Sequence, residues 1–231
     1  LDTGNNDLYL RFWMEIDTIK SGIFKNNAKW IPYNKGGGYR KWYGLNHYLI
    51  LWEDNGYELK YNSKANIRNE SYYFKRGLTW SDLSTNFYGA RYSDDRFIFD
   101  ASGPTMFPFN ENISLIQGLI NSKPFQNLLD VVCPGLHYNN GALAKVPTIL
   151  PQEDITRKQV IEIVDNSIKK SKRDWDSYET SWDFEYHPVV SNSIYKTIES
   201  MDTKTIVDYY QSWVSECEQR FNQLKANEEE L

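Results

Sequence analysis

The sequence predicts an α+β fold, with a strand-rich region packed by helices and then a helical extension. In the first part, short runs of Tyr, Trp, Phe and Ile are separated by Gly, Asn and Asp, which is typical of strands joined by turns. In the last part, apolar residues recur every three or four positions, which is typical of amphipathic helices. Charge supports a boundary at residue 151: residues 1–151 hold 16 basic and 14 acidic side chains, and residues 152–231 hold 10 and 17.

The expected elements of region 1–151 begin with a short helix, because apolar residues at positions 8, 12, 16 and 19 follow helical spacing and Asn5 or Asn6 can cap it. Strands are expected over 48–52, 71–74 and 97–99. The run at 54–56 (Asp-Asn-Gly) predicts a hairpin turn.

Helices follow the expected strands. One is expected from Asn112, and another from Ser122 with Pro124 in its first turn; both should pack on the sheet. The extension 152–231 should contain a helix over 156–172 and a long amphipathic helix from about residue 202. The segment between them, 172–184, mixes two Trp with several acids. We expect it to be extended, with rings docked on the neighbouring region and acids that either stay in water or pair with Lys and Arg.

Several classes of protein and site are disfavoured. No apolar run is long enough to cross a bilayer and no signal-peptide pattern opens the chain, so we expect a cytoplasmic protein. The two cysteines and three histidines lack metal-ligand spacing, so we expect no metal site. No catalytic motif such as GxSxG or HExxH occurs. Because the chain begins with Leu1 and stops inside a helical pattern, we expect a piece of a larger protein.

The main functional signal is a basic stretch, residues 18–52, which holds six Lys and Arg and no acid in a chain of net charge -5. Its cations alternate with aromatic rings around a run of three glycines, and such a surface suits nucleic acid. The candidate DNA-binding residues are Lys29, Trp30, Tyr33, Asn34, Lys35, Gly37, Arg40, Lys41, Trp42 and Tyr43. We assign Lys35, Arg40 and Lys41 mainly to phosphates, and Arg40 or Asn34 to base edges.

The alternative for this stretch is a sheet surface on which Lys stems cover apolar rings while the charged heads stay in water. The lack of any acid over 35 positions argues against that alternative, because a solvated structural face has no reason to exclude acids.

A second candidate for phosphate contacts spans residues 74–82 and continues at 90–92. Its contacting residues would be Lys75, Arg76, Thr79, Ser81 and Arg91. The alternative is a hairpin with ordinary solvated charges.

Blocks along nearly the whole chain resemble one family. The segments 1–7, 11–13, 29–44, 77–82, 90–92, 119–123 and 174–184 resemble, in order, the C-terminal half of PglX-like adenine-specific DNA methyltransferases of BREX phage-defence and type II restriction-modification systems. The resemblance implies S-adenosylmethionine-dependent methylation of adenine N6 in double-stranded DNA, with the target base flipped out of the duplex. The family's Asn-Pro-Pro-Tyr and cofactor-binding glycine motifs are absent here. No catalytic residue is therefore assigned, and the cofactor is expected in the parent protein rather than in this piece.

The leading hypothesis is thus a DNA target-recognition domain that serves an upstream methyltransferase domain of the same parent chain. The runner-up is a protein-interaction region that docks other defence-system proteins through the acidic helices. A weaker alternative is a carbohydrate-binding module, because Trp and Tyr platforms also stack on sugars.

Overall fold

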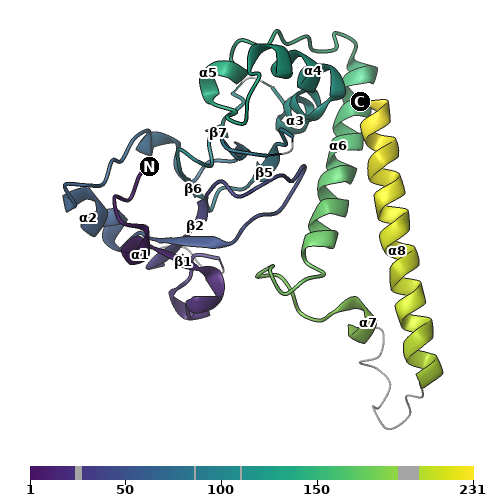
Figure 1. Ribbon diagram of the computed structural model, residues 1–231, viewed down its shortest axis with the longest axis horizontal. Coiled ribbons are helices and arrows are strands. Elements are labelled where there is room, and N and C mark those ends of the chain that lie inside the picture. The colour runs from purple at the N-terminus through teal and green to yellow at the C-terminus, as the bar shows by residue number, and fades with distance from the viewer. Residues whose placement is uncertain (24–27, 86, 110, 192–202) are drawn as a thin grey trace.

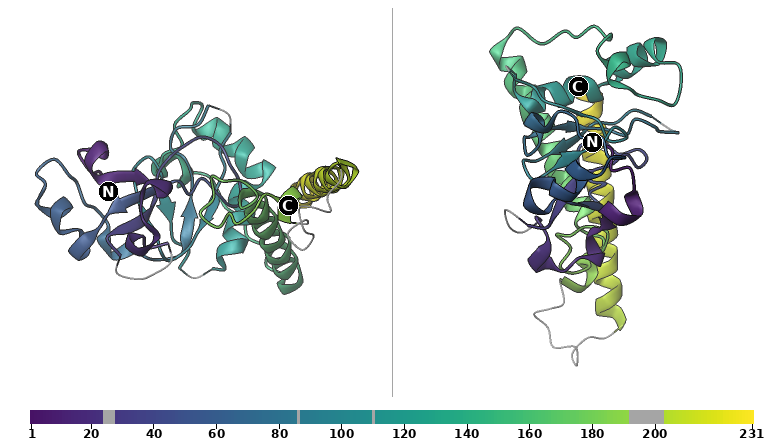
Figure 2. Two further views of the ribbon diagram at one scale, coloured as in Figure 1. Left: turned by 90° about the horizontal axis from the view of Figure 1, so that it is seen from below. Right: turned by 90° about the vertical axis from the view of Figure 1, so that its left-hand side faces the viewer.

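The α+β class is confirmed by the computed structural model, which describes residues 1–23, 28–85, 87–109, 111–191 and 203–231. Its described residues form one four-stranded and one three-stranded sheet, helices that pack beside the second sheet, and two long helices at one end (Figure 1). The left view of Figure 2 also shows the long helices at the end opposite α2.

The first sheet has the order β1-β3-β2-β6, formed by β1 (Leu10–Phe12), β3 (Tyr48–Leu51), β2 (Trp30–Asn34) and β6 (Ile98–Phe99). β3 pairs antiparallel with both β1 and β2, and β6 runs parallel to β2. Every residue of β2 is buried, as expected of an interior strand covered on both faces. The expected strands at 48–52 and 97–99 are therefore confirmed.

The N-terminal helix is shorter than predicted. α1 covers only Asn6–Tyr9, and the Asn5 side chain caps it by accepting a hydrogen bond from the Leu8 amide. Residues Leu10–Phe12 then pair with β3, so backbone pairing overrides the helical spacing of the apolar residues. Single-turn 3₁₀ helices follow at Trp13–Glu15 and Thr18–Lys20.

Two other predictions of local structure are wrong. Asp54, Asn55 and Gly56 do adopt the positive φ angles of turn residues, but they lie in α2 (Glu53–Tyr61), which directs Leu59 into the core, and they join no hairpin. Residues 71–74 form no strand: Glu70–Tyr72 is a 3₁₀ turn, with positive φ at Asn69 before it and at Phe74 after it. Of the aromatic residues there, Tyr73 packs in the first core against Trp52 and Phe99, and Phe74 is 42% exposed.

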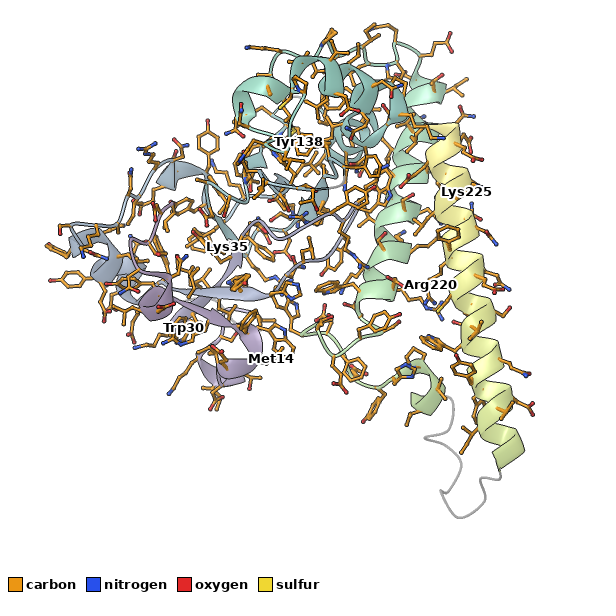
Figure 3. All side chains as sticks on the ribbon, in the orientation of Figure 1. Met14, Trp30, Lys35, Tyr138, Arg220 and Lys225 are labelled. Atoms are coloured by element: carbon orange, nitrogen blue, oxygen red, sulfur yellow. The ribbon has the colours of Figure 1, made fainter. Side chains whose placement is uncertain are left out.

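The second sheet has the order β5-β4-β7, formed by β5 (Arg91–Ser93), β4 (Gly77–Thr79) and β7 (Thr105–Met106). It shares its core with α3 (Ile113–Asn121), α4 (Lys123–Val132) and α5 (Asn140–Leu143). The predicted starts of α3 and α4 are confirmed, because Asn112 and Ser122 accept hydrogen bonds from amides in the first turns. In Figure 3, Trp30 lies in the first sheet's core and Tyr138 in the second.

The extension contains α6 (Asp154–Trp175), α7 (Pro188–Ser191) and α8 (Thr203–Glu230). α6 packs on α3 where Gly118 leaves room: a Cβ there would meet Val164 at 2.9 Å. α8 lies antiparallel beside α6, and in Figure 3 Arg220 lies between the two helices, 3.8 Å from Asp174. Both predicted helices are therefore confirmed, although α6 extends beyond both expected ends.

The segment 172–184 docks as predicted but is not extended. It consists of the end of α6 and a series of tight turns, which bring Trp182 against Phe97 in the first core. Lys172 binds both Asp176 and Asp183 within the segment, at 2.6 and 2.5 Å. The extension therefore contacts the first core through Trp182 and the second region through α3, and the division at residue 151 remains a prediction. No helix in the described part of the chain is long and apolar enough to cross a membrane.

Candidate nucleic-acid interface

The connection between β2 and β3, residues 35–47, is a long loop that we call the glycine loop. It leaves the first sheet and runs along the second: the Trp42 amide donates to the Ala90 carbonyl, and the Tyr92 amide donates to the Trp42 carbonyl, at 3.0 and 2.8 Å. Gly36 passes the Ser102 carbonyl so closely that a Cβ would lie 2.1 Å from its oxygen. The loop thereby joins the two sheets along most of its length.

The basic stretch is acid-free in sequence but not in space. Four of its cations bind carboxylates from elsewhere in the chain: Lys29–Glu53 at 2.5 Å, Lys35–Asp100 at 2.8 Å, Arg40–Asp174 at 2.8 Å and Lys41–Glu228 at 2.9 Å. Lys20 is exposed, and Lys25 lies outside the described residues. Two of the four carboxylates belong to α6 and α8, so the glycine loop is also where the helical extension attaches.

Among the four ion pairs, the Lys35–Asp100 pair has the least exposed carboxylate: the Asp100 side chain is 11% exposed. Burial alone would raise the pKa of Asp100, but hydrogen bonds and charge from Lys35, together with Ser102, outweigh burial and hold that pKa below its ordinary value. Lys35 (Figure 3) therefore joins the glycine loop to the first sheet and has little freedom to reach a phosphate.

Four aromatic rings of the stretch that were candidates for stacking on bases are core residues. Trp30, Tyr33, Trp42 and Tyr43 are all less than a tenth exposed, and none presents a face to which a base could stack in this conformation. The Trp42 ring nitrogen donates to Glu228 at 3.0 Å. Asn34, a candidate for contacts with base edges, is also buried, and its side-chain Nδ2 donates to the Ser93 hydroxyl at 2.7 Å.

The part of the glycine loop that does face solvent is its tip, Gly37, Gly38 and Tyr39. A Cβ built at Gly37 or Gly38 would meet nothing within 4 Å, and Gly38 has a φ of 84°. Ser81 holds the tip, because its hydroxyl accepts from the Gly37 amide and donates to the Gly38 carbonyl. The ring of Tyr39 contacts exposed Phe87 edge to face.

The second candidate segment splits into exposed and buried members. Lys75 and Arg76 are exposed; the Lys75 ammonium lies 5.2 Å from the Tyr72 ring centroid, and Arg76 is 3.6 Å from Asp95 with its side chain 68% exposed. Thr79 is buried and donates to the Pro104 carbonyl. Lys75 is thus free to contact a phosphate and Arg76 is accessible to one despite its exposed pair with Asp95, whereas Thr79 is not accessible.

Arg91 is the most unusual cation of the region. It is 2% exposed, and neither Nε nor Nη1 has a hydrogen-bond partner in the described part of the chain. Burial lowers the pKa of Arg91 to about 10, so the side chain stays charged at neutral pH. Its charge, after burial itself, also lowers the pKa of nearby His47.

Two features of this region were not predicted from the sequence. One is Glu228, which binds both Lys41 and Trp42. Glu228 and Trp42 are 186 positions apart along the chain, so no local sequence pattern predicts that they pair. The other is an aromatic group, Tyr72, Phe107 and Phe109, in which the ring centroids of the two phenylalanines lie 5.1 and 6.0 Å from that of Tyr72. Within the described residues, no three His, Cys, Asp or Glu side chains gather to hold a metal ion.

The fold and site define an α+β region with basic and aromatic surface segments. No protein-family model matches the sequence. The chain aligns over its whole length with the adenine-specific methyltransferase PglX of Lacticaseibacillus casei (strain Zhang), with 33% identity over 246 residues. An alignment that covers 83% of the chain gives 38% identity over 200 residues with the adenine-specific methyltransferase BrxX of Escherichia coli O9:H4 (strain HS).

The chain is therefore homologous to one region of the PglX-like adenine-specific methyltransferases, as the sequence resemblance predicted. It spans 20% and 16% of the length of these two relatives.

Proposed function

We propose that this region recognises duplex DNA for an S-adenosylmethionine-dependent adenine methyltransferase of a restriction-modification or phage-defence system, acting in the cytoplasm. In this proposal the region holds the DNA while a catalytic domain elsewhere in the parent protein binds the cofactor and flips and methylates the base. The support from homology is that the whole chain aligns with a region of proteins named adenine-specific methyltransferases.

The observation that carries the proposal is the exposure of three cations, Arg68, Lys75 and Arg76. Arg68 and Lys75 have no carboxylate partner among the described residues, and Arg76 has only one distant and exposed partner. Arg68 and Lys75 can therefore neutralise phosphates without first breaking an ion pair, whereas Arg76 would exchange its exposed pair with Asp95 for one with a phosphate. The glycine-loop tip, Gly37 to Tyr39, supplies backbone that can approach a groove closely.

Arg40 and Lys41 have a more conditional part in this proposal. Each already binds a carboxylate, from Asp174 and Glu228 respectively. DNA phosphates would have to displace those carboxylates, so these two side chains would contact DNA only if α6 or α8 shifts away from the loop.

The test is a comparison of paired variants by fluorescence anisotropy on a labelled DNA duplex across salt concentrations. The double variant Lys75→Ala/Arg76→Ala should weaken binding and lower the slope of log K against log salt by about 2, because each cation that neutralises a phosphate contributes about one to that slope. The matched control, Lys158→Ala/Lys225→Ala, removes the same charge from exposed positions of α6 and α8 and should leave the slope unchanged. Equal effects of the two pairs would contradict a local phosphate site.

A second candidate function has one specific observation in its favour. On α8, the apolar residues Ile206, Tyr210 and Phe221 are half or more exposed, within an extension whose acids outnumber its bases by 17 to 10. Such a face suits a protein partner, such as another defence-system component. A complex with that partner should persist at a salt concentration that abolishes DNA binding.

A further inference from the structure

A cleft of about 690 Å³ lies beside the second sheet and is lined by residues of five separate segments, three of which supply the groups that matter here. Tyr72 and Arg68 come from the segment before β4, Phe107 and Phe109 follow β7, and Asn140 begins α5. We call this site the aromatic cleft. Its volume lies in the range of pockets that hold small organic ligands.

The walls of the aromatic cleft offer flat apolar faces. The Tyr72 ring is tilted by 32° to that of Phe107 and stands edge-on to that of Phe109. Phe109 is 73% exposed, an unusual position for a large ring whose neighbours already form a cluster. Exposed aromatic faces at a concave site are the feature on which nucleobases stack.

The charges around the cleft favour an anionic ligand at its rim. Its two lining carboxylates are engaged: Asp100 binds Lys35 at 2.8 Å, and Asp82 lies 3.0 Å from the ring nitrogen of His137. Arg68 on the lining and Lys75 above the Tyr72 ring have no carboxylate partner in the described part of the chain. The rim therefore presents cations next to rings.

We infer that the aromatic cleft binds an unstacked nucleobase of a DNA strand, with the base against Tyr72 and Phe109 and an adjoining phosphate against Arg68 and Lys75. A neutral sugar or a lipid chain could contact the rings but carries no anionic group for the cations. A nucleotide has both a flat base for the rings and a phosphate for the cations. A base inside a duplex has both faces covered by its neighbours, so the ligand must be a single-stranded or locally opened segment. This inference rests on the proposed DNA-binding function and adds to it a base-binding site that shares Arg68 and Lys75 with the proposed phosphate contacts.

Photocrosslinking tests the site directly. A single-stranded oligonucleotide carrying 5-iodouracil is irradiated with the protein, and the crosslinked peptide is identified by mass spectrometry. Crosslinks at Tyr72, Phe107 or Phe109 are expected. Crosslinks confined to the glycine-loop tip or to other exposed rings would overturn the assignment.

Affinity gives the second readout. Phe109→Ala removes a mostly exposed ring, so the fold should be retained, and it should weaken binding of the unmodified single strand by about five- to tenfold, the lower range for removal of one base-stacking ring. The matched control is Tyr61→Ala, which removes an exposed ring from α2, far from Phe109 in sequence and outside the cleft's lining. Equal affinities for the two variants would refute the cleft.

The duplex measurements separate this inference from the proposed function. If Phe109→Ala leaves single-strand binding unchanged while Lys75→Ala/Arg76→Ala still weakens duplex binding, the aromatic cleft is wrong and the proposed function stands. If neither single-stranded nor duplex DNA binds the wild-type chain, both are wrong.

Discussion

Glu228 is the side chain whose removal should most clearly reveal how the helical extension is attached. It accepts from the Lys41 ammonium at 2.9 Å and from the Trp42 ring nitrogen at 3.0 Å, and the Trp42 side chain is almost completely buried. Glu228→Ala removes both bonds and leaves the Trp42 nitrogen without an acceptor.

The expected loss of stability follows from these two hydrogen bonds. An unsatisfied buried donor costs about 1–3 kcal/mol, and the partly enclosed ion pair with Lys41 adds at most about 1 kcal/mol. We therefore expect Glu228→Ala to lower the free energy of unfolding by about 2–3 kcal/mol. Glu228→Gln keeps an oxygen that can accept from Trp42, so its cost should be nearer about 1 kcal/mol.

Urea denaturation followed by tryptophan fluorescence measures both losses. Hydrogen exchange of the last turns of α8 should quicken in Glu228→Ala, because the effect is local to the junction between α8 and the glycine loop. The control is Glu229→Ala, an exposed neighbour on the same helix that should change stability by less than about 0.5 kcal/mol. If Glu228→Ala and Glu229→Ala behave alike, Glu228 does not attach α8 to the loop.

Three further predictions concern pH and packing. Burial, followed by the charges of two nearby arginines, lowers the pKa of His47, so the unfolded chain binds a proton more readily and stability should fall as pH drops below about 6.5. His47→Gln should remove part of that pH dependence in urea melts, and an unchanged pH dependence would contradict the burial of His47. Gly118→Val should destabilise by about 1–3 kcal/mol, measured by thermal unfolding, because its side chain would overlap Val164 across the α3–α6 contact; an unchanged melting temperature would contradict that packing. Leu49→Ala, in the centre of β3, should cost about 2–5 kcal/mol in the same assay, and a loss below about 1 kcal/mol would show that the first core is not formed there.

The helices were predictable from the sequence because their signals are local. Asn112 and Ser122 mark the first turns of α3 and α4 within three residues, and the periodicity of α6 and α8 extends over many turns. The strand at 48–52 was predictable for the same reason. The run at 71–74 looked like a strand because aromatic residues are frequent in strands, but none of the described strands pairs with it.

The basic stretch shows the limit of this reasoning for sites. The composition of these 35 positions shows that no acid lies among them, but it does not show which acids approach them in the fold. The four carboxylates that pair with its cations lie at least 24 positions away from them along the chain: Glu53, Asp100, Asp174 and Glu228. Likewise, the rings that suggested a stacking surface are buried, Trp30 and Tyr33 in β2 and Trp42 and Tyr43 in the glycine loop. The exposure of Lys75 and Arg76, by contrast, agreed with their position between short elements.

The most direct test of the proposed function is the affinity of the wild-type chain for duplex DNA between about 50 and 200 mM salt, a range over which binding through phosphates weakens in a known way. We predict measurable binding that weakens steeply and linearly on logarithmic axes, with a slope of at least about 2 in magnitude. Binding that does not change with salt, or no binding at the lowest salt, would contradict the proposed DNA recognition.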